Sequence, residues 1–247
     1  MKRALVLLIA APLFSCSPIA SSVPADVASA ANPEEALVPK GGTKGELFTF
    51  YVPNGISRWK WNWTSKLDFT GVSWNDDRTA TLISPQYVVM AAHFIRPPNV
   101  AVMFHDKNGK PYERFISKVE TIKNSDVAVG KLNLPLPTDI KAYRFASASQ
   151  AQPGRSVFIT DQDRVVSVHK IGNVFGKGIR FDYNTNLNSI YRRKLIPGDS
   201  GNPSFLLENG ELRLLETHSS GGGGSGPNYS NPELQASIRG AIATMGN

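Results

Sequence analysis

The chain has 247 residues, of which 41% are hydrophobic and 19% charged, and its formal net charge at pH 7 is +7. This length supports one large β domain or two small subdomains with a substantial core, and the composition excludes a disordered chain. No run of five basic residues occurs, and the densest cluster, residues 192–194, is typical of a solvated surface, so we predict no nucleic-acid binding.

The N-terminus has the pattern of an export signal. Two basic residues precede an apolar run over residues 4–14, which is too short to span a bilayer and is typical of a secretory signal. We therefore predict a signal peptide over residues 1–16 and a protein exported to the periplasm, the cell surface or the medium.

The sole cysteine, Cys16, ends the segment Leu13-Phe14-Ser15-Cys16. This segment resembles the bacterial lipobox, whose cysteine is lipidated and becomes the first residue of the mature protein. The alternative is a leader that is cleaved elsewhere, after Ala20 or Ala30. Membrane attachment is expected only through a lipidated Cys16. With one cysteine the chain has no internal disulfide, so we expect its stability to come from packing.

Residues 17–45 are rich in Ser, Ala, Pro and Val without a sustained hydrophobic period, which predicts a flexible linker or a propeptide. Residues 46–247 form the predicted domain. Here short apolar runs alternate with turn signals such as Asn108-Gly109 and Asn209-Gly210. The expected strands include 79–83, 87–90, 100–104, 115–122, 127–132, 156–160, 165–170, 178–183 and 212–217. Their lengths and spacing predict a sandwich or barrel of short antiparallel strands.

A helix is predicted at the end of the chain. Asn231 is suited to cap it, Pro232 to occupy its first position, and Leu234, Ile238 and Ile242 form an apolar stripe. We expect this stripe to pack on the β-sheet body.

Three segments carry residue types suited to nucleophilic catalysis. In 82–93 an apolar strand pair ends in Ala91-Ala92 and is followed by His93. In 124–132 Asp126 opens an apolar strand, which shields a carboxylate from water. In 197–203 a serine lies between glycines in a tight turn, where backbone N–H groups converge near its hydroxyl.

These segments resemble the histidine, aspartate and serine motifs of the chymotrypsin-like serine proteases, in that family's order. The resemblance covers roughly residues 65–245. It implies an all-β fold of two antiparallel six-stranded β-barrels, divided near residues 140–152, with a C-terminal α-helix.

The resemblance also implies roles for individual residues. Ser200 is the nucleophile, His93 the general base and Asp126 the acid that orients the imidazole, while the backbone N–H groups of Gly198 and Ser200 form the oxyanion hole. Asp106 is the competing acid, but Asp106-Lys107-Asn108-Gly109 is typical of a hairpin turn. We expect a monomer acting on protein or peptide substrates with no cofactor. We also expect no metal, because no His/Cys cluster has metal-ligand spacing.

The sequence departs from the family at three places. Asn202 replaces the second glycine that usually follows the nucleophile, and Phe94 stands where many animal members have a cysteine, as in a disulfide-free bacterial branch. No activation terminus of the Ile-Val-Gly-Gly type is present. In digestive members that terminus pairs with the acid beside the serine. Asp199 has this position here, so we expect it to have another partner.

The residues expected at the substrate pocket indicate a preference for Glu or Asp before the cleaved bond. By the same resemblance Lys194, His218 and Ser219 fall at the primary specificity pocket, and His218 resembles the pocket histidine of bacterial glutamyl endopeptidases. The competing interpretations are that Lys194 points to solvent and that His218 is a structural residue at a strand end. The glycine-rich stretch 221–226 is also typical of a flexible loop.

Two other functions are compatible with these motifs. One is a catalytically inactive member of the fold used for binding or adhesion. The other is an esterase, which the order of the motifs disfavours, because α/β-hydrolases place the serine before the acid and the histidine.

Overall fold

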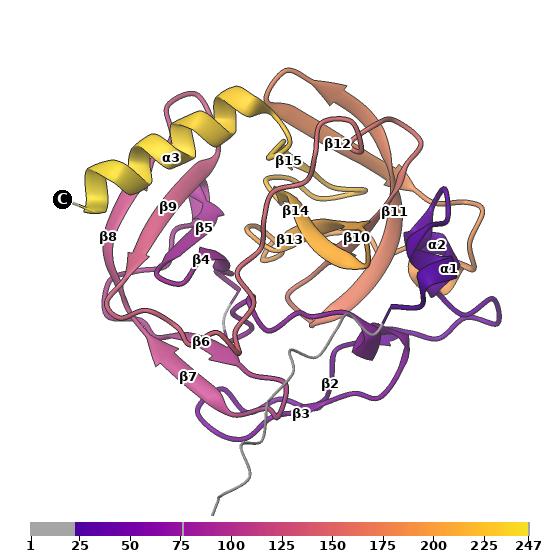
Figure 1. Ribbon diagram of the computed structural model, residues 1–247, viewed down its shortest axis with the longest axis horizontal. Helices are drawn as coiled ribbons and strands as arrows, with labels where there is room; N and C mark the ends of the chain where they lie inside the picture. The colour runs from indigo at the N-terminus through magenta and orange to yellow at the C-terminus, as the bar shows by residue number, and fades with distance from the viewer. Residues whose placement is uncertain (1–22, 76, 247) are drawn as a thin grey trace, which may run out of the picture.

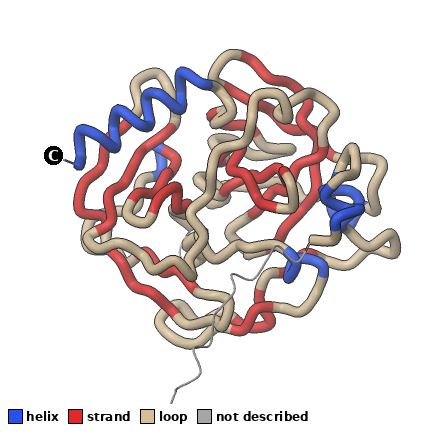
Figure 2. The backbone as a smooth tube through the Cα atoms, in the orientation of Figure 1, coloured by secondary structure: helices blue, strands red, loops and turns tan. Residues whose placement is uncertain are grey.

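The computed structural model describes residues 23–75 and 77–246, and most of the regular structure in this part of the chain is β-strand. Two β-barrels lie beside each other, the first built from β4–β9 and the second from β10–β15 (Figure 1). Figure 2 shows helical segments near the two ends of the described chain and short helical turns between them, and within the described residues the α-helices are those at the ends. The predicted all-β fold with two barrels and a C-terminal helix is confirmed.

The first barrel contains a four-stranded antiparallel sheet in the order β4-β5-β9-β8 and the hairpin β6-β7. Its core consists of apolar side chains such as Leu82, Val88 and Phe104, all fully buried. The strands are β4 (Thr81–Ser84), β5 (Tyr87–Ala91), β6 (Val102–His105), β7 (Pro111–Arg114), β8 (Ile116–Thr121) and β9 (Val127–Leu132).

The second barrel is one sheet in the order β14-β13-β10-β11-β12-β15, and the short β1 (Gly45–Glu46) adds to β11. The glycine-rich stretch expected to be a flexible loop instead contributes β15, which pairs with β12. The strands are β10 (Ser156–Thr160), β11 (Val165–Phe175), β12 (Gly178–Tyr183), β13 (Pro203–Glu208), β14 (Glu211–Thr217) and β15 (Ser225–Pro227).

The turns of the β6–β7 and β13–β14 hairpins are formed by the residues that the sequence predicts. Asp106 Oδ1 accepts hydrogen bonds from the backbone N–H groups of Asn108 (2.8 Å) and Lys110 (3.0 Å), so this aspartate shapes the β6–β7 turn. Asn209 and Gly210, between β13 and β14, have φ of 53° and 76°, which a two-residue hairpin of this kind requires.

The C-terminal helix α3 (Pro232–Gly246) lies across β8 and β9 of the first barrel (Figure 1). Asn231 Oδ1 caps it by accepting from the N–H groups of Glu233 (2.9 Å) and Leu234 (3.1 Å). Leu234 and Ile238 are fully buried, so the predicted apolar stripe packs on the sheet.

The segment before the first barrel does not have the character of a flexible linker within residues 23–45. It forms α1 (Ala25–Ala28) and α2 (Pro33–Leu37), and α2 packs on β10 and β13. The physical reason is Glu34, whose buried carboxylate accepts from Leu207 N–H at 2.7 Å and pairs with Arg155 at 3.3 Å. The composition of residues 17–45 does not indicate these contacts, because the partners of Glu34 lie more than 100 residues away in the sequence.

The remaining described elements are short. The hairpin of β2 (Phe48–Phe50) and β3 (Arg58–Trp59) follows β1, and three 3₁₀ turns occur at η1 (Trp63–Lys66), η2 (Ala92–Phe94) and η3 (Ser189–Tyr191). None of the helices within residues 23–246 has both the length and the hydrophobicity to cross a bilayer. The predicted signal peptide and Cys16 lie outside the described residues.

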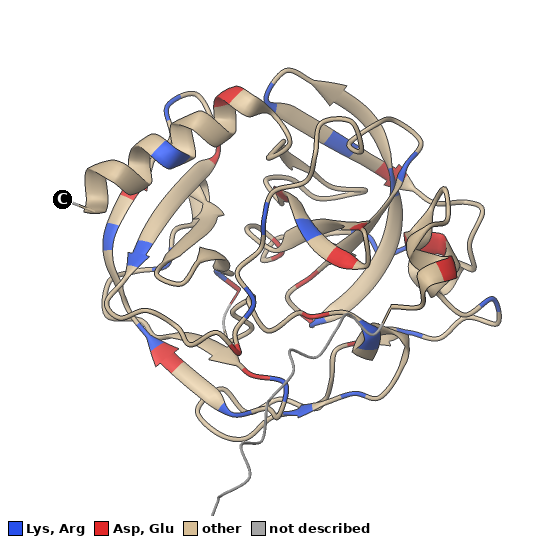
Figure 3. Cartoon of the chain, viewed as in Figure 1, with Lys and Arg blue, Asp and Glu red and all other residues tan. Residues whose placement is uncertain are grey.

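Charged residues of both signs are interspersed along the ribbon (Figure 3). In the basic cluster, Arg192 donates to the backbone oxygens of residues 184, 185 and 187, and Arg193 pairs with Asp161 and Asp163. Two of these three cations therefore hold loops of the second barrel together, while Lys194 is exposed.

Candidate active site

Three side chains predicted from separate motifs meet between the barrels. His93 comes from η2 at the end of β5, Asp126 directly precedes β9, and Ser200 lies in the turn before β13. His93 Nε2 is 2.9 Å from Ser200 Oγ, and His93 Nδ1 is 2.6 Å from Asp126 Oδ2. One continuous hydrogen-bonded path therefore joins the hydroxyl, the imidazole and the carboxylate.

The Asp126 carboxylate is held from three directions. Besides the imidazole, the backbone N–H of His93 donates to Oδ1 at 2.8 Å, and Ser219 Oγ donates to Oδ2. Because a carboxylate only accepts hydrogen bonds, His93 Nδ1 carries a proton, and in the neutral imidazole Nε2 then has its lone pair toward Ser200. This is the tautomer that a general base needs.

The turn before the serine presents two unused backbone donors. Gly198 has φ of 100°, and Asp199 N–H closes the turn on Ile196 O at 3.1 Å. Within the part of the chain that the structure describes, the N–H groups of Gly198 and Ser200 have no hydrogen-bond acceptor. Both are thus available to an oxyanion beside Ser200 Oγ, which is the role predicted for them.

The carboxylate of Asp199, the residue before Ser200, accepts hydrogen bonds from other parts of the fold. Asp199 is buried, and its carboxylate accepts from the backbone N–H groups of Gln162 (3.0 Å) and Ile196 (2.7 Å). Gln162 also fills the space beside Gly198, where an added Cβ would lie 2.4 Å from its Oε1. Two amides thus satisfy the carboxylate that was expected to need another partner.

Small residues let the two barrels meet behind the serine. Gly201 has φ of 85°, and a Cβ there would lie 3.1 Å from Thr79 O and 3.7 Å from Ala91 Cβ. The next residue, Asn202, is fully buried, donates to Asp199 O at 3.2 Å and accepts from Thr79 Oγ1 at 3.1 Å. The asparagine that departs from the family pattern therefore links the nucleophile turn to the first barrel.

A pocket of about 250 Å³ opens beside Ser200. Its lining residues are Ile196, Pro197, Asp199, Ser200, His218, Ser219, Ser220 and Gly221. His218 and Ser219, which were predicted for the specificity pocket, are among them. Lys194 is not, and its side chain is exposed, so the alternative interpretation of this lysine is the one that the structure supports.

His218 is engaged inside the protein. Its Nδ1 lies 2.9 Å from a carboxylate oxygen of Glu216, and its Nε2 lies 3.0 Å from Thr160 O. Burial, the largest single effect, lowers the pKa of His218, but the charge and hydrogen bond of Glu216 together with Thr160 O and the Asp199 carboxylate outweigh it, and the net shift is upward. The charge of a protonated His218 is thus matched by Glu216 rather than left for a ligand.

The pocket serines are also engaged, which sequence reasoning missed. Ser219 Oγ donates to Asp126, and Ser220 Oγ lies 2.6 Å from Ser225 Oγ. No local pattern distinguishes a serine that binds a substrate from one that positions an acid. Gln162 was missed for the same reason, since it lies in the β10–β11 turn without any motif around it.

The other two histidines among the described residues are structural. Burial lowers the pKa of His105, whose Nε2 lies 3.1 Å from Val52 O, and lowers the pKa of His169 to about 4. His169 Nδ1 lies 2.8 Å from Gly223 O and so steadies the loop that ends at β15. Within residues 23–75 and 77–246, no three His, Cys, Asp or Glu side chains are grouped so as to hold a metal ion.

The two barrels and the turn geometry define the chymotrypsin-like serine protease fold. Among solved structures, the chain is similar to kallikrein-related peptidase 10, with 15% sequence identity and a TM-score of 0.51. The match covers 67% of this chain and 89% of the other. Neither a protein-family model nor a curated protein matches the sequence. At this identity the similarity shows the fold, so conclusions about chemistry depend on the site itself.

Proposed function

We propose that the protein is a serine endopeptidase. The observation that carries this proposal is the unbroken path from Ser200 Oγ through His93 to Asp126, beside two backbone N–H groups that have no acceptor among the described residues. An ordinary turn serine has no need of an imidazole aligned by a carboxylate that two other groups hold in place.

The reaction follows from this arrangement. Ser200 Oγ attacks the carbonyl carbon while its proton passes to His93 Nε2, and the Gly198 and Ser200 N–H groups bind the resulting oxyanion, each donor worth ~3 kcal/mol in the transition state. The C–N bond then breaks, the leaving amine takes the proton from His93, and an acyl-enzyme remains. Water attacks the ester with His93 again as base, which releases the acid and restores Ser200.

The side chain bound before the cleaved bond is proposed to be uncharged. The predicted acidic preference depended on Lys194, which does not line the pocket, and on His218, whose two ring nitrogens already have partners in the protein. Ser219 and Ser220 are engaged as well. A buried carboxylate would therefore find no side-chain donor, and burial without one is costly.

The site of action is proposed to lie outside the cytoplasm. This proposal rests on the basic and apolar pattern of residues 1–16, which is the form of a secretory signal. Mass spectrometry of the mature protein would test it, because an intact N-terminal methionine in the exported fraction contradicts signal cleavage.

The test of the proposed activity uses a fluorophosphonate and a peptide library on the purified protein. Wild type should be labelled at Ser200 and should cleave peptides after uncharged residues, whereas Ser200→Ala should do neither. Ser220→Ala is the matched control, because it removes a serine hydroxyl in the same pocket but outside the proposed path. Equal cleavage by wild type and Ser200→Ala would contradict the mechanism, and cleavage mainly after Glu or Asp would contradict the uncharged preference.

A further inference from the structure

A second and larger cavity lies away from the catalytic residues. Its volume is about 620 Å³, which falls in the range of sites for small organic molecules. It shares no lining residue with the pocket beside Ser200, and none of His93, Asp126 and Ser200 lines it. Its walls come from η1 and the residues around it, from the β6–β7 and β13–β14 turns, and from Lys141 in the segment between the barrels.

One side of this cavity is aromatic. Trp59 is fixed in place, since its ring stacks on Phe48 with centroids 4.2 Å apart and its Nε1 donates to a backbone oxygen of the β6–β7 turn at 2.7 Å. Trp61 is 93% exposed, so the faces of its indole are open to a ligand. The buried side chains of Leu47 and Phe69 are also part of the lining. These side chains favour a ligand with a flat apolar face.

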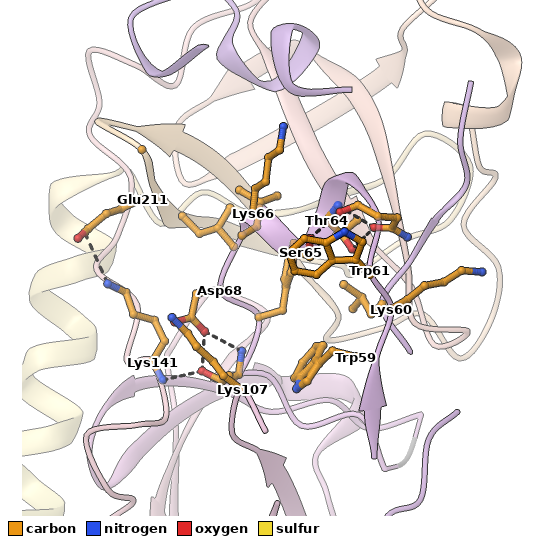
Figure 4. A pocket seen from close by; sticks show the side chains of 17 residues that line it. Trp59, Lys60, Trp61, Thr64, Ser65, Lys66, Asp68, Lys107, Lys141 and Glu211 are labelled. Carbon is orange, nitrogen blue, oxygen red and sulfur yellow. Dashed lines mark hydrogen bonds and ion pairs between the residues drawn. The ribbon is translucent and has the colours of Figure 1, made fainter. Parts of the chain in front are cut away.

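Another side carries two ion pairs. Lys107 Nζ lies 3.2 Å from Asp68 Oδ2. Lys141 Nζ lies 3.6 Å from Glu211 Oε2, and Figure 4 shows both pairs to the left of the two indoles. In each pair a carboxylate, which only accepts hydrogen bonds, lies beside an ammonium group, which only donates them. Two neighbouring hydroxyl groups of a ligand can therefore bond to one pair, the first donating to the carboxylate and the second accepting from the lysine.

The remaining charged residues of the lining also have partners. Lys60 pairs with the Glu46 carboxylate beside the cavity, and Lys66 interacts with another group of the protein. The lining thus offers an ionic ligand no unpaired counter-charge. A hydrocarbon ligand would cover the two ion pairs without replacing their hydrogen bonds to water, which is costly. A ligand that suits both sides is uncharged, with an apolar face and hydroxyl groups at its edge.

We propose that this cavity binds a neutral saccharide. The C–H face of a pyranose ring would lie against the indole of Trp61, with Trp59 beside it, and the ring hydroxyls would bond to the two ion pairs. Exposed ion pairs contribute little stability by themselves, so these two can adjust to the hydroxyls at small cost. The saccharide is a free oligosaccharide or a stretch of a polysaccharide, because both present the same ring face and hydroxyl edge.

Isothermal titration calorimetry on the Ser200→Ala protein tests this proposal independently of peptidase activity. The neutral probes are cellohexaose and chitohexaose, whose β-linked rings present C–H groups on both faces, and the charged probe is hexagalacturonate. At least one neutral hexamer should bind with a dissociation constant of about 1 mM or lower, and hexagalacturonate at least tenfold more weakly. Raising the salt from about 0.05 to 0.5 M should change the affinity for the neutral hexamer less than twofold, because screening acts on charges.

Matched variants locate the site. Trp61→Ala should weaken binding of the neutral hexamer at least tenfold, because it removes the indole face, and Lys107→Met should weaken it about fivefold, because it removes a hydrogen-bond donor. Phe175→Ala, at another exposed aromatic, and Lys123→Met, at another exposed lysine, should leave binding within twofold of the parent protein. Binding of neither neutral hexamer, binding of hexagalacturonate as tight as theirs, or an unchanged affinity in Trp61→Ala overturns the proposal.

Cosedimentation with insoluble cellulose and chitin distinguishes the two sources of the saccharide. If the protein binds a neutral hexamer and is also retained on the matching polymer, the ligand is a stretch of polysaccharide. Binding of the hexamer without retention on the polymer assigns the cavity to a free oligosaccharide. Both results support a saccharide site, and in either case Trp61→Ala should abolish most of the binding.

Discussion

Replacement of Glu34 by alanine is expected to destabilise the whole second barrel. Glu34 is fully buried in α2 and joins the N-terminal segment to β10 and β13 through Arg155 and the Leu207 amide. Its neighbour Glu35 adds hydrogen bonds to Ser156 Oγ (2.6 Å) and Asn184 Nδ2 (2.8 Å). The segment therefore behaves as part of the barrel rather than as a tether.

The loss in free energy of unfolding depends on the buried groups that lose their partner in the Glu34→Ala variant. Removing one partner of a buried ion pair costs ~3–5 kcal/mol. Arg155 keeps its bonds to Leu207 O and Gln150, and its side chain is 13% exposed, which favours the lower end of that range. Burial raises the pKa of Glu34, with Arg155 opposing, so a neutral amide fits this site better than a void. We expect a loss of about 3 kcal/mol for Glu34→Ala and about 1–2 kcal/mol for Glu34→Gln.

Urea unfolding followed by circular dichroism measures this loss. With a slope of ~2 kcal/mol per molar urea, Glu34→Ala should lower the midpoint by ~1.5 M. Asp26→Ala is the control, since Asp26 lies exposed on α1 of the same segment and should change stability by less than ~0.5 kcal/mol. If Glu34→Ala unfolds at the midpoint of wild type, the segment does not belong to the cooperative unit and the reasoning fails.

Three further substitutions probe the site and its surroundings. Ser219→Ala should lower kcat/KM roughly tenfold and alter its pH profile, because Asp126 loses a donor worth ~1–1.5 kcal/mol, while Ser220→Ala should leave both unchanged. Gly198→Ala should reduce fluorophosphonate labelling strongly, because φ of 100° strains an alanine and its Cβ would displace the Gln162 amide from beside the nucleophile turn, whereas Gly154→Ala, at φ of 85° in open space, should label normally. Asp161→Asn should alter the pH dependence of stability. Burial raises the pKa of Asp161 from 3.8 to about 6, although Arg193 opposes this shift. The stabilising contribution of the protonated carboxyl is therefore present below pH 3.8 and lost as the pH rises through about 6. Between pH 4 and 7 the wild type should lose up to about 3 kcal/mol relative to Asp161→Asn in urea titrations, and parallel curves for the two proteins would contradict this.

Local patterns sufficed for much of the fold. The ranges predicted for β9, β10 and β12 coincide with the strands, because each is a short run of apolar or alternating residues bounded by turn residues. β15 was missed because Ser225-Gly226-Pro227 has poor strand propensity. It forms through pairing with β12, and Gly226 is required there because a Cβ would lie 2.2 Å from Thr217 O.

Long-range contacts explain the rest of the site. The motifs around His93, Asp126 and Ser200 were visible in the sequence, and the barrels bring them together. The exposure of Lys194 depends on how the loop after η3 folds, and the hydrogen bond from Ser219 to Asp126 joins residues 93 positions apart, which no spacing along the chain encodes. Residues that act through a partner are therefore the ones that a single sequence leaves unpredicted.

The hydrogen bonds of Asp199 help to fix the shape of the nucleophile turn. In digestive members of the resembled family a new N-terminal amine pairs with this acid, and here two amides from Gln162 and Ile196 already occupy both of its oxygens. The same contacts keep Ile196 and Gly198 in the turn that leaves the two donor N–H groups free of acceptors. The Asp199 carboxylate therefore has a backbone donor on each oxygen, at 3.0 and 2.7 Å, without an N-terminal amine. Within the described residues, the nucleophile turn is thus held by contacts among Gln162, Ile196 and Asp199, with no N-terminal amine among the hydrogen-bond partners of Asp199.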